Sequence, residues 1–199
     1  IWDAAAEAAL AAQGPRPALA AFWRPRLARI GGFVIAEEAK LREGGHIAAS
    51  FTEREGRLTL RRPGGAVVLK ARADRIDRLG DGSLLVLDYK TGSVPTAEAL
   101  RDGTAPQLPL EAAMALEGAF EGIPPAAVRA LTYWRLTGGQ EPGEVKEMLS
   151  EVEDVADAAA HALDRLGALV DRFLLGDAAF AARPHPARAP KGEDFDHLS

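Results

Sequence analysis

Residues 71–92 read ARADRIDRLGDGSLLVLDYKTG, and this stretch decides the fold of the chain. Two β-like runs, at 66–74 and 84–89, are separated by the turn signal Gly80-Asp81-Gly82, so the sequence predicts an antiparallel hairpin. Residues 84–87 are apolar at four consecutive positions, which is typical of a central strand covered on both faces. The charged residues that follow this run therefore lie at the end of a buried strand.

Asp88 and Lys90 are two residues apart on this strand, so their side chains project from the same face while Tyr89 points to the other. Asp74, on the neighbouring strand of the hairpin, brings a second carboxylate within reach. Two carboxylates, a backbone carbonyl and waters form the all-oxygen shell that Mg²⁺ prefers. We therefore predict a metal site at Asp74 and Asp88, with the carbonyl of Tyr89 as a third ligand.

These residue types suit the hydrolysis of a phosphodiester. A divalent cation lowers the pKa of a bound water and neutralises charge on a phosphate oxygen. Lys90 can orient the attacking water or stabilise the pentavalent phosphorus transition state. We expect Mg²⁺, for which Mn²⁺ can substitute; a simple ion pair at the strand end is the alternative that spacing alone leaves open.

Helices and further strands surround the hairpin in the sequence. Residues 1–43 are alanine-rich and suit helices, with an interruption at the turn signal of residues 14–17. We expect strands at 47–53, 57–61 and 130–136, helices at 106–120 and 151–175, and an extended tail at 183–190. This order predicts a mixed α/β fold in which a central sheet is flanked by helices.

Composition narrows the class of protein. The 199 residues are 47% hydrophobic and 27% charged, which fits a globular protein with one sizeable core. The absence of cysteine excludes disulfides, zinc knuckles and thiolate-bound iron–sulfur clusters within the chain. Neither a run of about eighteen apolar residues nor a signal peptide occurs, so we expect a cytoplasmic protein without a membrane span.

The charge balance gives a mixed indication about nucleic acid. The formal net charge of -5 argues against a generic polyanion binder, because such modules usually carry a basic surplus. Arginines nevertheless cluster at 24–29, 54–62 and 72–78. These clusters are either solvated faces with ion pairs or the rim of a groove that DNA enters.

The ordered motifs resemble the RecB-family branch of the PD-(D/E)XK nucleases. They are RADRID at 72–77, DYKTG at 88–92 and QLPL at 107–110. The likeness is greatest to the carboxy-terminal nuclease domain of the AddB subunit of AddAB helicase–nucleases. It extends to YWRL at 133–136 and to FDHL at 195–198, and so covers most of the chain.

This resemblance implies a restriction-endonuclease-like core and a Mg²⁺-dependent DNase of the exonuclease type. It makes Asp74 and Asp88 metal ligands and Lys90 the catalytic lysine. Gln107 would orient that lysine or contact DNA. The implied role is double-strand break processing for recombinational repair, with DNA and a helicase–nuclease subunit of the AddA type as partners. No iron–sulfur cluster is expected, because the chain lacks cysteine.

The domain organisation follows from the same likeness. We expect residues 1–199 to form a single nuclease domain, a C-terminal fragment of a larger subunit. Within it we predict a helical lead-in at 1–45, a catalytic core at 46–136, and a C-terminal helix and tail at 151–199. The alternative to a nuclease is a non-catalytic DNA-binding or scaffolding module of the same fold, and a third hypothesis is a hydrolase of another phosphate ester.

Several positions depart from the family pattern or have rival interpretations. Where the pattern commonly has a tyrosine, four residues after the motif glutamine, this chain has Glu111. Relatives often carry a histidine on a helix before the sheet, and none of the four histidines of this chain is placed for that role. Asp77 lies on the opposite strand face from Asp74, so we expect it to cap the turn or pair with a neighbouring arginine. Glu37 and Glu38 lie where the superfamily sometimes supplies an acidic ligand, but we expect both to be solvent-exposed.

Overall fold

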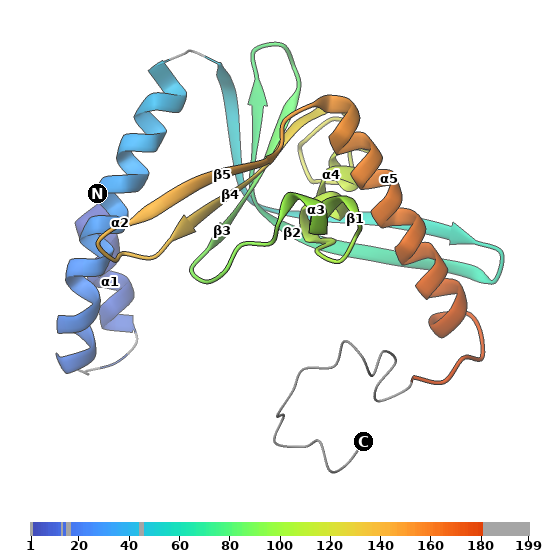
Figure 1. The fold of residues 1–199 in the computed structure, drawn as a ribbon, viewed down its shortest axis with the longest axis horizontal. Helices are drawn as coiled ribbons and strands as arrows, with labels where there is room; N and C mark the ends of the chain where they lie inside the picture. The colour runs from blue at the N-terminus through green and yellow to red at the C-terminus, as the bar shows by residue number, and fades with distance from the viewer. Residues whose placement is uncertain (1, 13, 15–16, 44–45, 181–199) are drawn as a thin grey trace.

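The computed structural model describes residues 2–12, 14, 17–43 and 46–180, which form helices around one sheet (Figure 1). The helices are α1 (Trp2–Ala12), α2 (Pro17–Glu43), α3 (Ala97–Arg101), α4 (Gln107–Leu116), α5 (Val152–Leu169) and a π-helical turn, η1 (Val170–Leu174). The strands are β1 (Ile47–Arg62), β2 (Gly65–Leu79), β3 (Leu84–Lys90), β4 (Val128–Leu136) and β5 (Gly143–Leu149).

The strands form one sheet in the order β1-β2-β3-β4-β5. β3 and β4 pair in parallel, whereas the other neighbours pair antiparallel, so the sheet is mixed. The parallel step is made through α3 and α4, which lie between β3 and β4 in the chain. The predicted mixed α/β fold with a helix-flanked central sheet is therefore confirmed.

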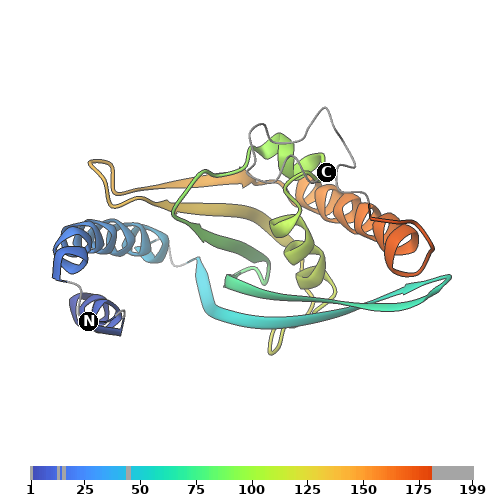
Figure 2. The ribbon, with the colours of Figure 1, turned by 90° about the horizontal axis from the view of Figure 1, so that it is seen from below.

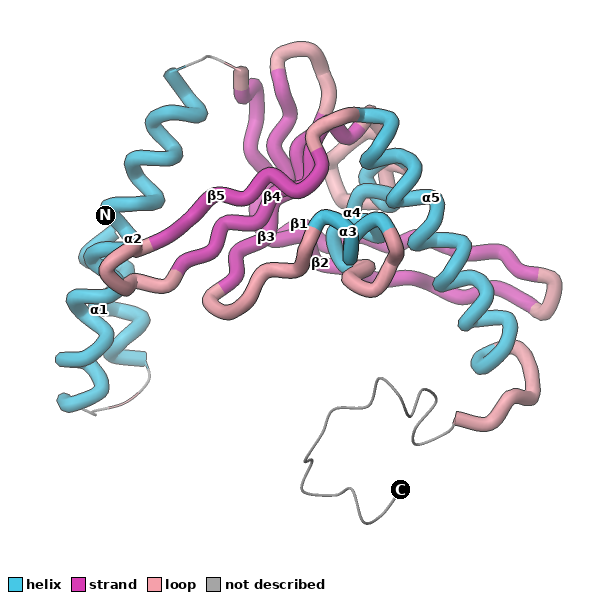
Figure 3. The backbone as a smooth tube through the Cα atoms, viewed as in Figure 1, coloured by secondary structure: helices cyan, strands magenta, loops and turns pink. Residues whose placement is uncertain are grey.

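The helices are divided between the two sides of the sheet, as the tube in Figure 3 shows. α4 and α5 pack against each other and against β4, and α3 packs beside them. α1 packs on α2, which contacts β5 at the other end of the molecule. The long β1–β2 hairpin extends past α4 as a curved ribbon (Figure 2). None of the described helices combines the length and apolar character that a membrane crossing requires.

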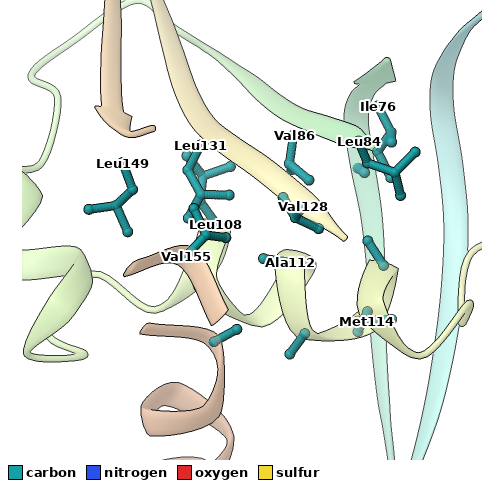
Figure 4. Packing of buried hydrophobic residues seen from close by; sticks show 14 of the residues in the cluster. Ile76, Leu84, Val86, Leu108, Ala112, Met114, Val128, Leu131, Leu149 and Val155 are labelled. Atoms are coloured by element: carbon teal, nitrogen blue, oxygen red, sulfur yellow. The ribbon is translucent and has the colours of Figure 1, made fainter. Parts of the chain in front are cut away.

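The core lies between the sheet and the helices α4 and α5 (Figure 4). Alternate residues of β3 and β4, such as Val86 and its partner Leu131, are fully buried on this face. Leu108 and Met114 of α4 pack against them, together with Val155 of α5. This packing fixes the start of α4 over the last residues of β3.

β1 is a single strand, so the prediction of two strands at 47–53 and 57–61 was wrong. Pairing continues because β2, with 15 residues against the 16 of β1, runs beside β1 from Ile47 to Arg62. The gap between the two predicted strands corresponds to a local irregularity, since Glu53 has a φ of 53°, but the register of the pairing is the same on both sides of it. Gly56, between the two predicted strands, lets the buried Phe120 ring approach β1.

Other differences also have local causes. β5 and α3 were not predicted, because β5 is rich in charge and α3 is only five residues long. The helix expected at 106–120 ends at Leu116, since Gly118 takes a φ of 66° and reverses the chain. The helix expected at 151–175 is α5 followed by η1. The expected tail at 183–190 lies outside the described residues.

Gly56 provides a test of this packing. A Cβ at this position would lie 2.6 Å from Cδ1 of Phe120 and 2.8 Å from Cε of Met114. Gly56→Ala is therefore expected to lower the free energy of unfolding by about 1–3 kcal/mol, the usual cost of overpacking. Urea denaturation measures the change.

Gly32→Ala is the matched control, because Gly32 lies in α2 where an added methyl group would point into open space. This change should stabilise the chain by up to about 1 kcal/mol, the helix-propensity difference. Equal effects of the two substitutions would contradict the packing described here.

Candidate active site

The two predicted carboxylates meet because β2 and β3 pair in the expected register. Arg75 pairs with Leu87 in the β2–β3 ladder, so the preceding residue of β2, Asp74, lies beside Asp88. Oδ2 of Asp74 accepts a hydrogen bond from the backbone nitrogen of Tyr89 at 3.0 Å. One carboxylate is thus fixed to the strand that carries the other.

Gln107 joins Lys90 to Asp88. Its Oε1 accepts a hydrogen bond from Lys90 Nζ at 2.9 Å, and its Nε2 donates to Oδ1 of Asp88 at 2.6 Å. Lys90 Nζ also lies 2.9 Å from Oδ2 of Asp88. Gln107 is the first residue of α4, so the packing of that helix on the core sets the position of its side chain. The structure therefore brings Asp74, Asp88, Lys90 and Gln107 together.

Glu111 belongs to the same cluster, although sequence reasoning set it aside as a departure from a pattern. It lies one turn after Gln107 on α4, and its Oε1 accepts a hydrogen bond from Gln107 Nε2 at 3.3 Å. Glu111 is buried, with only 4% of its surface exposed. The spacing of four residues from Gln107 on a helix was the signal that could have placed it here.

Burial changes the protonation of Glu111. Burial raises its pKa to about 7, and the charges of Asp88 and Asp74 act in the same direction. The hydrogen bond from Gln107 and the charge of Lys90 act against this rise. Tyr133, which faces Asp88 across the β3–β4 pair, likewise has a pKa raised by burial and by the charges of Asp88 and Glu111.

The Lys90 ammonium lies beside an aromatic ring. Lys90 Nζ lies 5.7 Å from the centre of the Tyr133 ring, a distance at which a cation–π attraction applies. Tyr133 is buried, whereas the Lys90 side chain is 30% exposed. The ammonium therefore lies at the boundary between the core and the solvent, where it is accessible from outside.

The opposite face of the same strands carries a second network of charges. Arg75 is buried and pairs with Asp77 of its own strand and with Glu38 of α2. Burial alone would lower the pKa of Arg75, but its hydrogen bonds to Asp77, Glu38 and Tyr89 outweigh burial and raise it. The Tyr89 hydroxyl lies on this face, 3.5 Å from a guanidinium nitrogen.

These contacts test what the sequence predicted for Asp77 and for the two glutamates of α2. Asp77 pairs with a neighbouring arginine, as predicted. Glu38 is not a solvated side chain, because it reaches across to the buried Arg75. Glu37 pairs with Lys40, and its side chain, like that of Glu38, is only 21% exposed, so the expected solvent exposure was wrong for both.

Many of the clustered arginines make contacts within the chain. Arg24 pairs with Glu7, Arg62 with Asp171, and Arg72 with Glu53. Arg26 and Arg29 donate to backbone carbonyls at Thr137 and Gly138. These side chains fit the ion-pair interpretation of the clusters better than a groove rim.

The oxygen atoms of the site fit a divalent cation. Oδ2 of Asp88 and Oε2 of Glu111 are buried without a hydrogen-bond donor. For Asp88 the short distance to Lys90 is an ion pair without hydrogen-bond geometry. Among the described residues, no group of three acidic or histidine side chains is close enough together to hold a metal ion. The amide nitrogen of Gln107 instead donates hydrogen bonds to both Asp88 and Glu111. Unsatisfied carboxylate oxygens are the donors that Mg²⁺ and Mn²⁺ prefer.

One comparison with known proteins, the match to a protein family, agrees with this chemistry. A model described as the PD-(D/E)XK nuclease superfamily matches residues 1–188. Uncharacterised proteins of Rickettsia conorii and Rickettsia typhi are each 37% identical over 70 residues. That match covers 35% of this chain but only 8% of the length of each relative. The crystal structure of SSO0001 aligns with a TM-score of 0.38 and 16% identity, over 83% of this chain and 68% of that one.

The raised pKa of Glu111 predicts a pH dependence of stability. The ordinary pKa is 4.5 and the folded value is about 7, so the folded state holds the proton more tightly. This contribution is complete below the ordinary pKa and is lost as the pH rises through the folded one. With a metal chelator present, the unfolding free energy should fall by roughly 2–3 kcal/mol between about pH 5 and about pH 8, relative to that of Glu111→Gln.

Urea denaturation of the two proteins across this pH range measures the difference. Glu111→Gln keeps the size of the side chain and an oxygen for Gln107, so it removes the titration with little other change. Parallel pH profiles for the two proteins would show that Glu111 does not titrate in this range.

Proposed function

Because the chain belongs to the PD-(D/E)XK nuclease superfamily, we propose that it is a metal-dependent domain that hydrolyses phosphodiester bonds in DNA. The observation that carries this proposal is the hydrogen-bonded connection from Lys90 through Gln107 to Asp88. This connection supports a joint catalytic function of the three residues, because an ordinary surface ion pair does not need a third side chain to orient it.

The proposed metal ligands are the carboxylates of Asp74 and Asp88 and the carbonyl of Tyr89, which would hold Mg²⁺ or Mn²⁺. When bound, such a cation neutralises charge on a phosphate oxygen and makes water more acidic. Asp74 is already oriented by the Tyr89 amide. Its carboxylate therefore loses little conformational freedom when it takes up a ligand role.

Lys90 is the proposed catalytic residue. In hydrolysis a water oxygen forms a new bond to phosphorus and gives up a proton to solvent, and the bond to the leaving oxygen breaks as that oxygen takes up a proton from solvent. Negative charge builds on the phosphoryl oxygens between these events. The Lys90 ammonium remains protonated and stabilises that charge. Gln107 accepts a hydrogen bond from the ammonium and so restricts the directions in which it can point. Gln107 therefore acts as a positioning residue.

The biological role that we propose is more specific. The motifs around Asp74, Asp88 and Gln107 resemble those of RecB-family nucleases of the AddB type, which supports exonucleolytic processing of double-strand breaks for recombinational repair. In that role the domain would be part of a longer subunit and would work beside an AddA-like helicase–nuclease partner in the cytoplasm. The whole protein's activity is part of this proposal, since the matched segment covers only 8% of the curated relatives.

Lys90→Ala tests the catalytic assignment. If the ammonium stabilises the transition state, single-turnover cleavage of labelled single- or double-stranded DNA with Mg²⁺ should slow by on the order of a hundredfold or more. The melting temperature should change little, because Gln107 still donates to Asp88. A purely structural ion pair would instead lower stability by roughly 3–5 kcal/mol and leave the specific activity of the folded fraction unchanged.

Lys40→Ala is the matched control, since this lysine lies on α2 and its side chain is 68% exposed. Its cleavage rate should equal that of the wild type. Asp88→Asn should abolish cleavage together with metal binding. Binding of DNA without any Mg²⁺- or Mn²⁺-dependent cleavage by the wild type would favour a non-catalytic module.

A further inference from the structure

The catalytic residues proposed above leave the buried carboxylate of Glu111 without a role. We infer that Glu111 is a third acidic ligand of the divalent cation, an inference that rests on the proposed nuclease function. The argument comes from the position of Glu111, from the hydrogen bonds that its two oxygens make or lack, and from the charge around it.

Glu111 and Asp88 are held by the same atom. Nε2 of Gln107 lies 2.6 Å from Oδ1 of Asp88 and 3.3 Å from Oε1 of Glu111. An amide NH₂ group carries two partly positive hydrogens, and it can satisfy one oxygen of each carboxylate. The two carboxylates are therefore close enough to share one small positive group.

The remaining oxygens of the same two carboxylates lack a donor. Oε2 of Glu111 is buried without a hydrogen bond, whereas Oδ2 of Asp88, also without one, lies 2.9 Å from the Lys90 ammonium as an ion pair. Both residues are less than a twentieth exposed, at 3% and 4%. A buried carboxylate oxygen without a partner is costly, and such atoms in a folded protein usually face an ion or a water.

The charges around Glu111 also favour a bound cation. When ionised, Glu111 is a third negative charge beside Asp74 and Asp88, against the positive charge of Lys90. A divalent cation would balance this charge and take up the unpaired Oε2 of Glu111. Carboxylate oxygens from two strands and a helix would then surround it, which suits a hard cation that takes oxygen ligands.

Mn²⁺ binding measured by titration calorimetry tests the inference without any readout of cleavage. Glu111→Gln keeps an oxygen for Gln107 but removes the charge, so we expect the affinity of the 199-residue chain for Mn²⁺ to fall by about tenfold or more. The increase in melting temperature caused by Mn²⁺ should shrink in parallel. Glu117→Gln is the control, because Glu117 is exposed at the end of the same helix and should leave both values unchanged.

The outcomes separate this inference from the proposed function. Affinity within twofold of the wild type in Glu111→Gln overturns the role of Glu111 alone, provided that Asp88→Asn abolishes binding. A wild type that binds no Mn²⁺ overturns the proposed metal centre and this inference with it. Should Glu111→Gln not fold, Glu111→Asp keeps the charge on a shorter side chain and is expected to bind Mn²⁺ more weakly; an unchanged affinity there overturns the inference.

Discussion

The hydrogen bonds of one side-chain amide connect the parts of this molecule on which its chemistry depends. Gln107 contacts Lys90 and Asp88 on β3 and Glu111 on its own helix. These contacts require that α4 begin directly above the end of β3, and the burial of Leu108 in the core holds it there. The polar site and the apolar core are therefore built from adjacent residues of the same helix, so the geometry of the site depends on the packing of the core.

Much of the site could be predicted from sequence because it depends on strand geometry. Alternation along β3 places Asp88 and Lys90 on one face and Tyr89 on the other, and the short turn after β2 returns the chain so that Asp74 lies beside them. Gln107 could not be placed in this way. Its contact depends on the crossover between β3 and β4, and only the likeness to known motifs indicated it.

The features that sequence did not reveal depend on tertiary contacts. β1 continues past Glu53 because a partner strand of nearly equal length is available, whereas its local sequence suggests a break. The burial of Glu111 and the pairing of Glu38 with Arg75 depend on how helices dock on the two faces of the sheet. A charged residue on a helix is usually solvated; for Glu111 the spacing of four residues from Gln107 was the one sequence signal of its place in the site.

The open order of the sheet leaves β1 and β5 as its outer strands, and the segment after α4 changes what β1 offers to other chains. Arg57 donates from its backbone to Ala119 at 2.9 Å, and Glu121 donates to Glu55 at 3.0 Å. The middle of the β1 edge is thus already hydrogen-bonded by this segment. Exposed strand edges are templates for aggregation and for the addition of foreign strands. This protein closes the centre of that template with its own backbone, so an additional strand would have to displace residues 119–121 before it could extend the sheet there.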